Sequence, residues 1–225
     1  MITYIYKYKI IPERKKMTNG NDNSDDEQEH EIDYKIENVV ATVVVDVEDK
    51  IDLTTIARKH VDVEYNPERF PGLVMRIEEP RATILIFSTG KMVVTGMRRA
   101  SEAEAVVDKA IKKIKKAGVE IGKPEITIQN IVASGDLHTH VDLNMGAIVM
   151  ESAMYEPEVF PGLIYRMKDP KTVFLIFSTG KIVCTGTKDK QDVHDAVIKL
   201  NKEVRDLDIA RDQMGGGEYQ DITFI

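Results

Sequence analysis

The sequence predicts an α+β protein in which two tandem copies of one unit contribute their strands to a single antiparallel sheet. Three observations predict this class: an internal duplication divides the chain, short β-branched segments separated by turn signals fill most of each copy, and an amphipathic helical segment closes each copy. The composition, 42% hydrophobic and 31% charged residues, is ordinary for a globular domain. No stretch approaches the roughly 18 uncharged apolar residues that a transmembrane helix requires.

The duplication is clearest between residues 69–96 and 159–186, which align at an offset of 90 without a gap. Sixteen of the 28 aligned positions are identical. The similarity extends upstream, where residues 36–41 resemble residues 128–133. Solenoid repeats have periods of about 20–50 residues. The longer period here indicates two fused copies of one unit, related by a pseudo-two-fold axis.

The formal net charge of −7 lies outside the duplicated part of the chain. Residues 34–205 carry 25 acidic and 25 basic side chains, whereas the first 17 residues are basic and both flanking tails are acidic. Residues 19–31 have the composition of a disordered segment, and the change in composition at Met17 makes that residue a candidate initiator. We expect four parts: an N-terminal extension over residues 1–33, a first repeat over 34–124, a second repeat over 125–207 and an acidic C-terminal tail over 208–225.

The elements of the first copy follow from periodicity and turn signals. Alternating β-branched residues predict a strand over residues 36–47, and Asp52 is a favourable N-cap for a short helix over residues 53–60. A short strand is expected within residues 61–66. Three more strands, separated by Glu79-Pro80 and by Ser88-Thr89-Gly90, are predicted over residues 73–78, 82–87 and 91–95.

A longer helix closes each copy. In the first copy it is predicted over residues 101–117, with Ser101 as N-cap, glutamates in its first turn, lysines in its last turn and Gly118 at its end. The second copy repeats the scheme and ends with a helix over residues 189–206.

The predicted strands are apolar on both faces, because Leu85 and Ile84, which are adjacent, point to opposite sides of one strand. The helices can cover one face of the combined sheet, and no predicted segment is left to cover the other. An uncovered apolar face of this size marks a binding surface. Its members in the first copy include polar residues that suit a partner with hydrogen-bond acceptors: Asn38 beside Val40, Thr95 beside Val93, and Arg76 nearby.

Enzymatic chemistry, the rival class, has little support. No nucleophile–base pair, carboxylate dyad or metal cluster recurs in both copies. His138 and His140 lack a set of cysteines or carboxylates at ligand spacing, and the Ser-Thr-Gly-Lys turns lack the full phosphate-loop motif. The single cysteine, Cys184, excludes an internal disulfide framework and favours a reducing compartment. We expect no catalytic residue, no metal and no cofactor.

Several long motifs are specific enough to identify a family. They are QNIVA at residues 129–133, YNPERF at 65–70, YEPEVFPGLIYR at 155–166, and LIFSTGK at both 85–91 and 175–181. Over about residues 36–207 the chain resembles the TATA-box-binding protein family of general transcription initiation factors, and its short acidic N-terminal tail is similar to that of archaeal members. The resemblance implies a saddle-shaped, highly curved sheet with helices on the convex face, in a cytoplasmic, nucleoid-associated protein of an archaeal cell.

The resemblance also implies a mode of DNA binding. The concave sheet would bind the minor groove of an A·T-rich promoter element, the TATA box, and kink it by inserting phenylalanines between base steps, as is established for this family. The intercalating positions match Phe70, Phe87, Phe160 and Phe177. The minor-groove positions match Asn38, Val40, Leu85, Val93, Thr95, Asn130, Val132, Leu175, Val183 and Thr185.

Other family positions imply phosphate and protein contacts. The phosphate-contacting positions match Arg76, Lys91, Arg166, Lys181, Thr89 and Thr179. The loop that the family presents to transcription factor B matches Glu156, Glu158 and Val159, where the first copy has Asn66, Glu68 and Arg69. The implied partners are double-stranded promoter DNA, transcription factor B and, indirectly, RNA polymerase. The uncovered apolar face itself predicts association with a second copy of the chain when DNA is absent.

Alternatives remain open at this point. A phenylalanine in an apolar strand is more often a core residue than a wedge, and an asparagine is common at strand edges and turns. The saddle could bind another ligand, or it could target DNA for repair or nuclease action.

Overall fold

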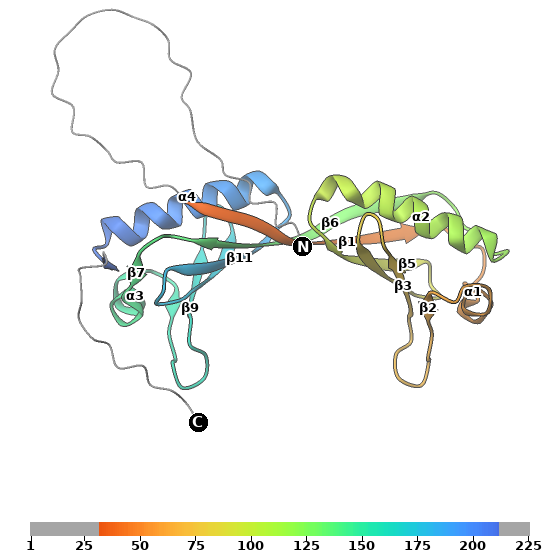
Figure 1. The fold of residues 1–225 in the computed structure, drawn as a ribbon, viewed down its shortest axis with the longest axis horizontal. Helices are drawn as coiled ribbons and strands as arrows, with labels where there is room; N and C mark the ends of the chain where they lie inside the picture. Colours follow the sequence, from red (N-terminus) through yellow and green to blue (C-terminus); the bar gives the residue numbers. More distant parts are fainter. Residues whose placement is uncertain (1–31, 212–225) are drawn as a thin grey trace, which may run out of the picture.

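The computed structural model describes residues 32–211, which form two similar halves that share one sheet (Figure 1). The first half comprises β1 (Asp33–Val45), α1 (Leu53–Lys59), β2 (Val63–Glu64), β3 (Leu73–Ile77), β4 (Ala82–Ile86), β5 (Lys91–Met97), the 3-10 helix η1 (Ala100–Glu102) and α2 (Ala103–Lys116). The second half comprises β6 (Pro124–Asp136), β7 (His140–Val141), α3 (Leu143–Val149), β8 (Ala153–Met154), β9 (Leu163–Met167), β10 (Thr172–Ile176), β11 (Lys181–Thr187), α4 (Lys190–Asp206) and β12 (Ala210–Arg211). The strands and helices predicted from the sequence are present, with shifted ends.

Ten strands form one antiparallel sheet in the order β2-β3-β4-β5-β1-β6-β11-β10-β9-β8. The order reads equivalently outward from the centre, because β1 and β6 are counterparts in the two halves, as are the edge strands β2 and β8. The predicted α+β class, with two tandem repeats joined in one sheet, is therefore confirmed.

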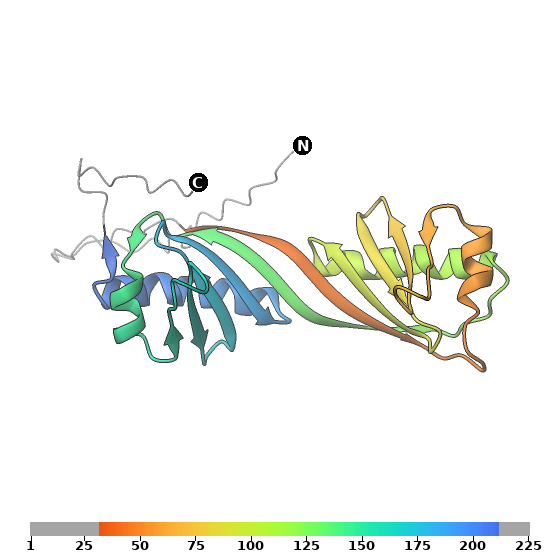
Figure 2. The ribbon, with the colours of Figure 1, turned by 90° about the horizontal axis from the view of Figure 1, so that it is seen from below.

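The two long central strands join the halves. β1 and β6 pair along their whole length, from Asp33 opposite Asp136 to Val45 opposite Pro124. The register shifts twice along this pairing, and such bulges increase the local bend and twist of a strand. The sheet arches into a saddle, with α2 and α4 along its convex side and α1 and α3 near its two ends (Figures 1 and 2).

The core lies between the convex face of the sheet and the helices. In β4, Ile84 and Ile86 are fully buried while Leu85, which points to the other face, is partly exposed. In β10, Phe174 is fully buried and the adjacent Leu175 is partly exposed. The long helices complete this layer with apolar stripes: Val106, Val107, Ala110 and Ile114 from α2, and Val193, Ala196, Val197, Leu200 and Val204 from α4.

The helix starts show one correct and one wrong prediction. Asp52 caps α1 as expected, because its carboxylate accepts hydrogen bonds from the backbone N–H groups of Thr54 and Thr55. Ser101 does not cap α2: it lies inside the 3-10 turn η1, and the α-helix begins only at Ala103. The Glu102 carboxylate instead accepts from the backbone N–H groups of Arg98 and Arg99, which precede the helix, as the glutamate of a capping box does.

The second half extends further than the sequence suggested. Four residues expected in the C-terminal tail, 208–211, belong to the folded part, since Ile209 is fully buried and β12 pairs with β7. The predictions on residues 1–31 and 212–225, including the initiator at Met17, lie outside the described residues. Within the described range, none of the helices has the length and apolarity needed to cross a membrane.

The alternation in β10 makes a stability prediction. Phe174→Ala should lower the free energy of unfolding by about 3–5 kcal/mol, because it empties a fully buried site between sheet and helices. Leu175→Ala, one residue away on the open face, should cost only about 1 kcal/mol. Urea unfolding followed by circular dichroism measures both; equal losses would contradict the assignment of the two faces.

Candidate nucleic-acid interface

The open face of the sheet carries six partly exposed apolar side chains in a pseudo-symmetric arrangement. The structure brings together all six positions predicted from the sequence: Val40, Leu85, Val93, Val132, Leu175 and Val183. Leu85 lies opposite Val93 in the first half, as Leu175 lies opposite Val183 in the second. No helix of residues 32–211 lies over this face (Figure 2). The result is a broad concave apolar surface that is accessible from outside.

Two asparagines lie at the centre of this surface. Asn38 of β1 is opposite Val132 of β6, and Asn130 of β6 is opposite Val40 of β1. This reciprocal register places one amide and one valine from each repeat beside the pseudo-two-fold axis.

The orientation of each amide group is defined by a backbone donor. The Oδ1 atom of Asn38 accepts a hydrogen bond from the backbone N–H of Gly96 at 2.8 Å, and that of Asn130 accepts from Gly186 at 2.9 Å. Each asparagine Nδ2 also lies within 3.2 Å of a threonine hydroxyl, Thr95 or Thr185. Because the oxygen is bound to a backbone donor, the nitrogen is presented as a donor at the centre of the face.

The four predicted wedge phenylalanines form two pairs, one in each half. The rings of Phe70 and Phe87 have centroids 5.8 Å apart at an interplanar angle of 66°, and those of Phe160 and Phe177 are 6.0 Å apart at 63°. These edge-to-face pairs lie where the loops before β3 and β9 meet the ends of β4 and β10. They are thus near the two ends of the open face and not in the helix-covered core.

Sequence reasoning missed a residue that shapes each pair. A Cβ atom at Gly72 would lie 2.7 Å from Cε1 of Phe70, and one at Gly162 would lie 2.7 Å from Cε1 of Phe160. Any larger residue would push the ring aside, so these glycines let the rings pack. The duplicated Phe-Pro-Gly segment was the signal that could have identified them.

The predicted phosphate-contacting residues line the rim, and all six are exposed: Arg76, Lys91, Arg166, Lys181, Thr89 and Thr179. They differ in their partners. Arg76 forms an ion pair with Glu64 at 2.6 Å, and Lys181 forms one with Asp136 at 3.2 Å. Among residues 32–211, neither Lys91 nor Arg166 has such a pair.

The carboxylates of these rim pairs respond to their partners. The hydrogen bond and the charge of Arg76 lower the pKa of Glu64. For Asp136, partial burial acts to raise the pKa, but the His138 backbone N–H and the Lys181 ammonium lower it overall. Both carboxylates are therefore held in the charged form that competes for the rim cations.

The centre of the face holds a charge that the sequence analysis did not single out. Ser134 donates a hydrogen bond to the Glu37 carboxylate at 2.8 Å, and Lys35 pairs with the same carboxylate at 2.7 Å. The hydrogen bond from Lys35 lowers the pKa of Glu37 against the effect of partial burial. In the other repeat, the counterpart of Glu37 is Gln129, whose amide donates to the Thr42 hydroxyl at 2.8 Å. The two halves of the face thus differ in charge.

A hollow of about 550 Å³ lies on the open face of the first half. Its lining combines apolar and rim residues: Thr42, Val43, Val44, Pro71, Phe87, Ser88, Thr89, Lys91, Met92 and Val93. An apolar floor beside a lysine and hydroxyl groups suits a partner that has apolar edges and an anionic backbone.

The loops between the edge strands and their neighbours project on the side opposite the helices (Figure 1). In the second half, this loop contains Glu156, Glu158 and Val159, all exposed, with Val159 at 80%. In the first half, Asn66 accepts a hydrogen bond from the Glu68 backbone N–H, so this asparagine stabilises its own turn. The two loops offer different surfaces to a protein partner.

The histidines and the cysteine take part in local structure. His138 lies 3.3 Å from Asp33 in an ion-pair geometry, and Nδ1 of His140 lies 3.2 Å from the Ser178 carbonyl oxygen. Residues 32–211 contain no group of three or more potential metal ligands. Burial raises the pKa of the Cys184 thiol to about 12, so this group stays protonated near neutral pH.

Comparison with known proteins places the chain among transcription factors. The family model described as "Transcription factor TFIID (or TATA-binding protein, TBP)" matches residues 33–117 and 125–207. The TATA-box-binding protein of Pyrobaculum islandicum is 49% identical over 189 residues, which cover 84% of this chain and 94% of that relative. The Aeropyrum pernix TATA-box-binding protein is 50% identical over 177 residues, covering 78% and 86%. The solved Methanococcus jannaschii TBP aligns with a TM-score of 0.68 at 44% identity, over 77% of this chain and 98% of that one.

The asparagine geometry can be tested in the protein alone. Asn130→Ala should lower the free energy of unfolding by about 1 kcal/mol, since it removes the acceptor of the Gly186 N–H, and should speed amide exchange at Gly186. Glu125→Ala, at an exposed position of the same strand, should change the unfolding free energy by under about 0.5 kcal/mol. Urea unfolding and NMR-detected exchange measure both; unchanged exchange at Gly186 would contradict the assigned orientation of the amide.

Proposed function

Since the chain belongs to the TATA-box-binding protein family, whose members are DNA-binding transcription factors and not enzymes, we propose that it acts as a general transcription initiation factor that binds TATA-box DNA. The two repeats, taken as residues 34–124 and 125–207, would each contribute half of one binding surface. The observation that carries the proposal is the concave apolar face, with two oriented asparagine donors at its centre and a phenylalanine pair toward each end.

The surface suits the minor groove of bent DNA. The duplex widens and flattens when apolar wedges unstack base steps, at a cost of a few kcal/mol per step. Phe70 with Phe87, and Phe160 with Phe177, would supply those wedges at the two ends of the contact. Contact between the flattened groove and the six apolar residues of the open face would offset the cost of unstacking.

Selection of A·T pairs would follow from the donors. In the minor groove, A·T and T·A pairs present only the acceptors N3 and O2, whereas a G·C pair adds the guanine amino group. The amide nitrogens of Asn38 and Asn130 can donate to those acceptors, with Thr95 and Thr185 beside them. A guanine amino group would meet a donor or a valine methyl group, and neither can accept its hydrogen.

The rim would position the DNA backbone. Lys91 and Arg166 are exposed cations that can meet phosphates directly, as Thr89 and Thr179 can through their hydroxyls. Arg76 and Lys181 must first leave Glu64 and Asp136, so phosphates compete with those carboxylates. These contacts fix the register of the duplex without reading its sequence.

Bending and binding of labelled duplexes test this proposal. We expect a TATA-containing duplex to be bound and bent, and a duplex with G·C substitutions to bind at least about tenfold more weakly, because each mismatched pair costs roughly 1–3 kcal/mol. The Phe160→Ala, Phe177→Ala double variant should bind the TATA duplex about 30-fold more weakly and lose bending, since removing an aromatic anchor of an interface typically costs about 2 kcal/mol. Fluorescence energy transfer between the duplex ends measures both quantities.

Controls separate a local effect from general damage. Ile198→Ala, an exposed position of α4 on the helix side, should leave bending unchanged. Sedimentation of the free protein should be run first, because we also propose that two copies associate through the apolar face without DNA; a monomer at all concentrations would remove that proposal. Equal binding of both duplexes, or unchanged bending by the double variant, would contradict the TATA-box proposal. The open face would then have to bind another ligand.

We further propose that the loop of the second repeat recruits transcription factor B, and through it RNA polymerase. The Glu156→Arg, Glu158→Arg variant should bind TATA DNA but lose the ternary complex with transcription factor B in a gel-shift titration, by at least about tenfold, because both exposed carboxylates are reversed in sign. The Asn66→Arg, Glu68→Arg variant changes the equivalent loop of the first repeat and should retain the complex. Equal loss in both variants would argue against this site.

A further inference from the structure

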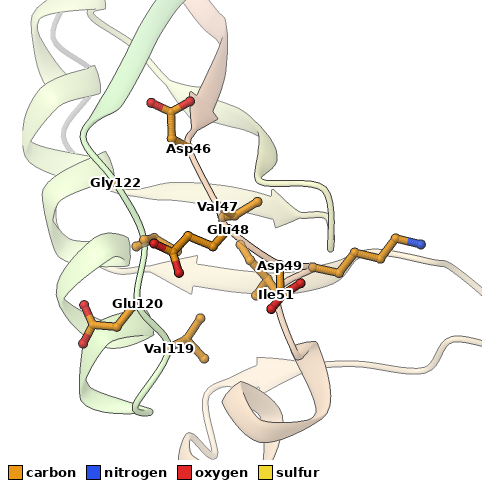
Figure 3. Close-up of a pocket in the computed structure, with 10 residues that line it drawn as sticks. Asp46, Val47, Glu48, Asp49, Ile51, Val119, Glu120 and Gly122 are labelled. Atoms are coloured by element: carbon orange, nitrogen blue, oxygen red, sulfur yellow. The ribbon is translucent and has the colours of Figure 1, made fainter.

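A second hollow lies at the far end of the first repeat, away from the surface described above (Figure 3). It has a volume of about 710 Å³ and is lined by residues 46–51, which follow β1, and residues 119–122, which follow α2. We call it the end groove. Its two walls are irregular segments, held together by one hydrogen bond from the Gly122 N–H to the Asp46 carbonyl oxygen at 2.9 Å.

In the second repeat the corresponding segments pair with each other. Val119 and Ile209 are counterparts, since each donates its N–H back to the long helix before it, to Ile114 and to Val204. In the second repeat the chain after this point forms β12, which pairs with β7, and the Asp142 N–H donates to the Ile209 carbonyl oxygen. In the first repeat the described residues form no strand pair at this place.

A difference in loop length accompanies the open groove. Two backbone hydrogen bonds anchor the loop equivalently in both repeats: Val45 to Gly90 and Ile51 to Ser88 in the first, Leu137 to Gly180 and Val141 to Ser178 in the second. Between these anchors, the first repeat has the five residues 46–50 and the second has the three residues 138–140. The longer loop separates the two walls, so backbone groups that are paired in the second repeat line an accessible groove in the first.

The end groove is acidic. Four of the ten lining residues are carboxylic acids, Asp46, Glu48, Asp49 and Glu120, against one lysine, Lys50. Figure 3 shows the Glu48 side chain extending toward the 119–122 segment, whereas the Glu120 carboxylate lies on the other side of that segment. A groove with irregular walls and an excess of three negative charges suits an extended basic peptide, whose main chain can hydrogen-bond to the backbone of the walls.

We propose that the end groove binds the chain's own N-terminal segment, residues 2–10, as an added strand. This segment alternates as a strand does: Ile2, Tyr4, Tyr6, Tyr8 and Ile10 share one side, and Thr3, Ile5, Lys7 and Lys9 share the other. The two lysines would face the carboxylates of the groove, while the aromatic and aliphatic side would pack on its apolar residues, Val47 and Val119.

The connecting chain is long enough. β1 begins at Asp33 and carries the chain over 13 residues to the groove, a distance of roughly 43 Å for a strand. The 21 residues between Ile10 and Ile32 can extend to roughly 70 Å. The segment can therefore reach the groove of its own molecule, and this inference does not depend on DNA binding.

Charge exchange in the full chain tests the proposal, with hydrogen–deuterium exchange mass spectrometry of residues 46–51 and 119–122 as the readout. Amides there should exchange about tenfold more slowly in the natural chain than in Lys7→Glu, Lys9→Glu, because two ion pairs and the added strand are lost. Glu48→Lys, Glu120→Lys should show the same loss. Combining the two pairs of substitutions should restore protection, since the signs are complementary again.

A matched control reverses two carboxylates that lie outside the end groove. Glu104→Lys, Asp108→Lys reverses two exposed carboxylates on α2 outside the groove and should leave exchange in the groove unchanged. Equal exchange in all variants, or a combined variant without restored protection, would overturn the proposal. So would protection that grows with protein concentration, which would indicate a second copy, or a mass of the natural protein that shows residues 1–16 absent.

Discussion

The antiparallel pairing of β1 with β6 is the interaction on which the rest of the structure depends. It joins the strands of the two repeats into one ten-stranded sheet. Its register sets Asn38 opposite Val132 and Asn130 opposite Val40, which puts both amide donors at the centre of the open face. Its register shifts bend the strands, and the resulting curvature gives that face the concave form that a rod-like partner such as duplex DNA would fit.

The helices lie on one side of this layer only, and this has an energetic consequence. The buried side gains the full hydrophobic stabilisation of side chains such as Phe174, while the open side leaves Leu175 and its counterparts partly exposed to water. A monomer rarely keeps so broad an apolar face without a partner. The exposed apolar area can therefore be buried by a binding partner, and its burial would stabilise the complex. Gly72 and Gly162 leave room for the phenylalanine pairs at the ends of this area.

Pseudo-symmetry describes the backbone better than the surface. Glu37 corresponds to Gln129, Glu64 to Met154, and the five-residue loop at 46–50 to three residues in the second repeat. The positions that are the same in both repeats pair the strands, pack the core and orient the two asparagine amides. The positions that differ lie at the centre of the open face, at the rim, in the projecting loops and at the end groove. A protein partner and the N-terminal segment would each meet one repeat and not the other, whereas duplex DNA would meet both.

The sequence by itself determined the duplication, the order of the elements, the two faces of the strands and the family, because these depend on residue periodicity and on motifs that are local in the chain. It also placed the phenylalanine, asparagine and valine positions of the candidate site through those motifs. Only the tertiary structure decided the direction of the asparagine amides, which depends on a glycine N–H 58 and 56 residues away, and the ion pairs of Arg76 and Lys181. The Ser101 cap failed for a related reason: which side chain satisfies a helix start depends on the backbone path into it, here a 3-10 turn. Periodicity in the sequence predicts which face of a strand a residue occupies. The hydrogen-bond and ion-pair partners that are distant in the chain are determined only by the register of the strands and by the pairing of the two repeats.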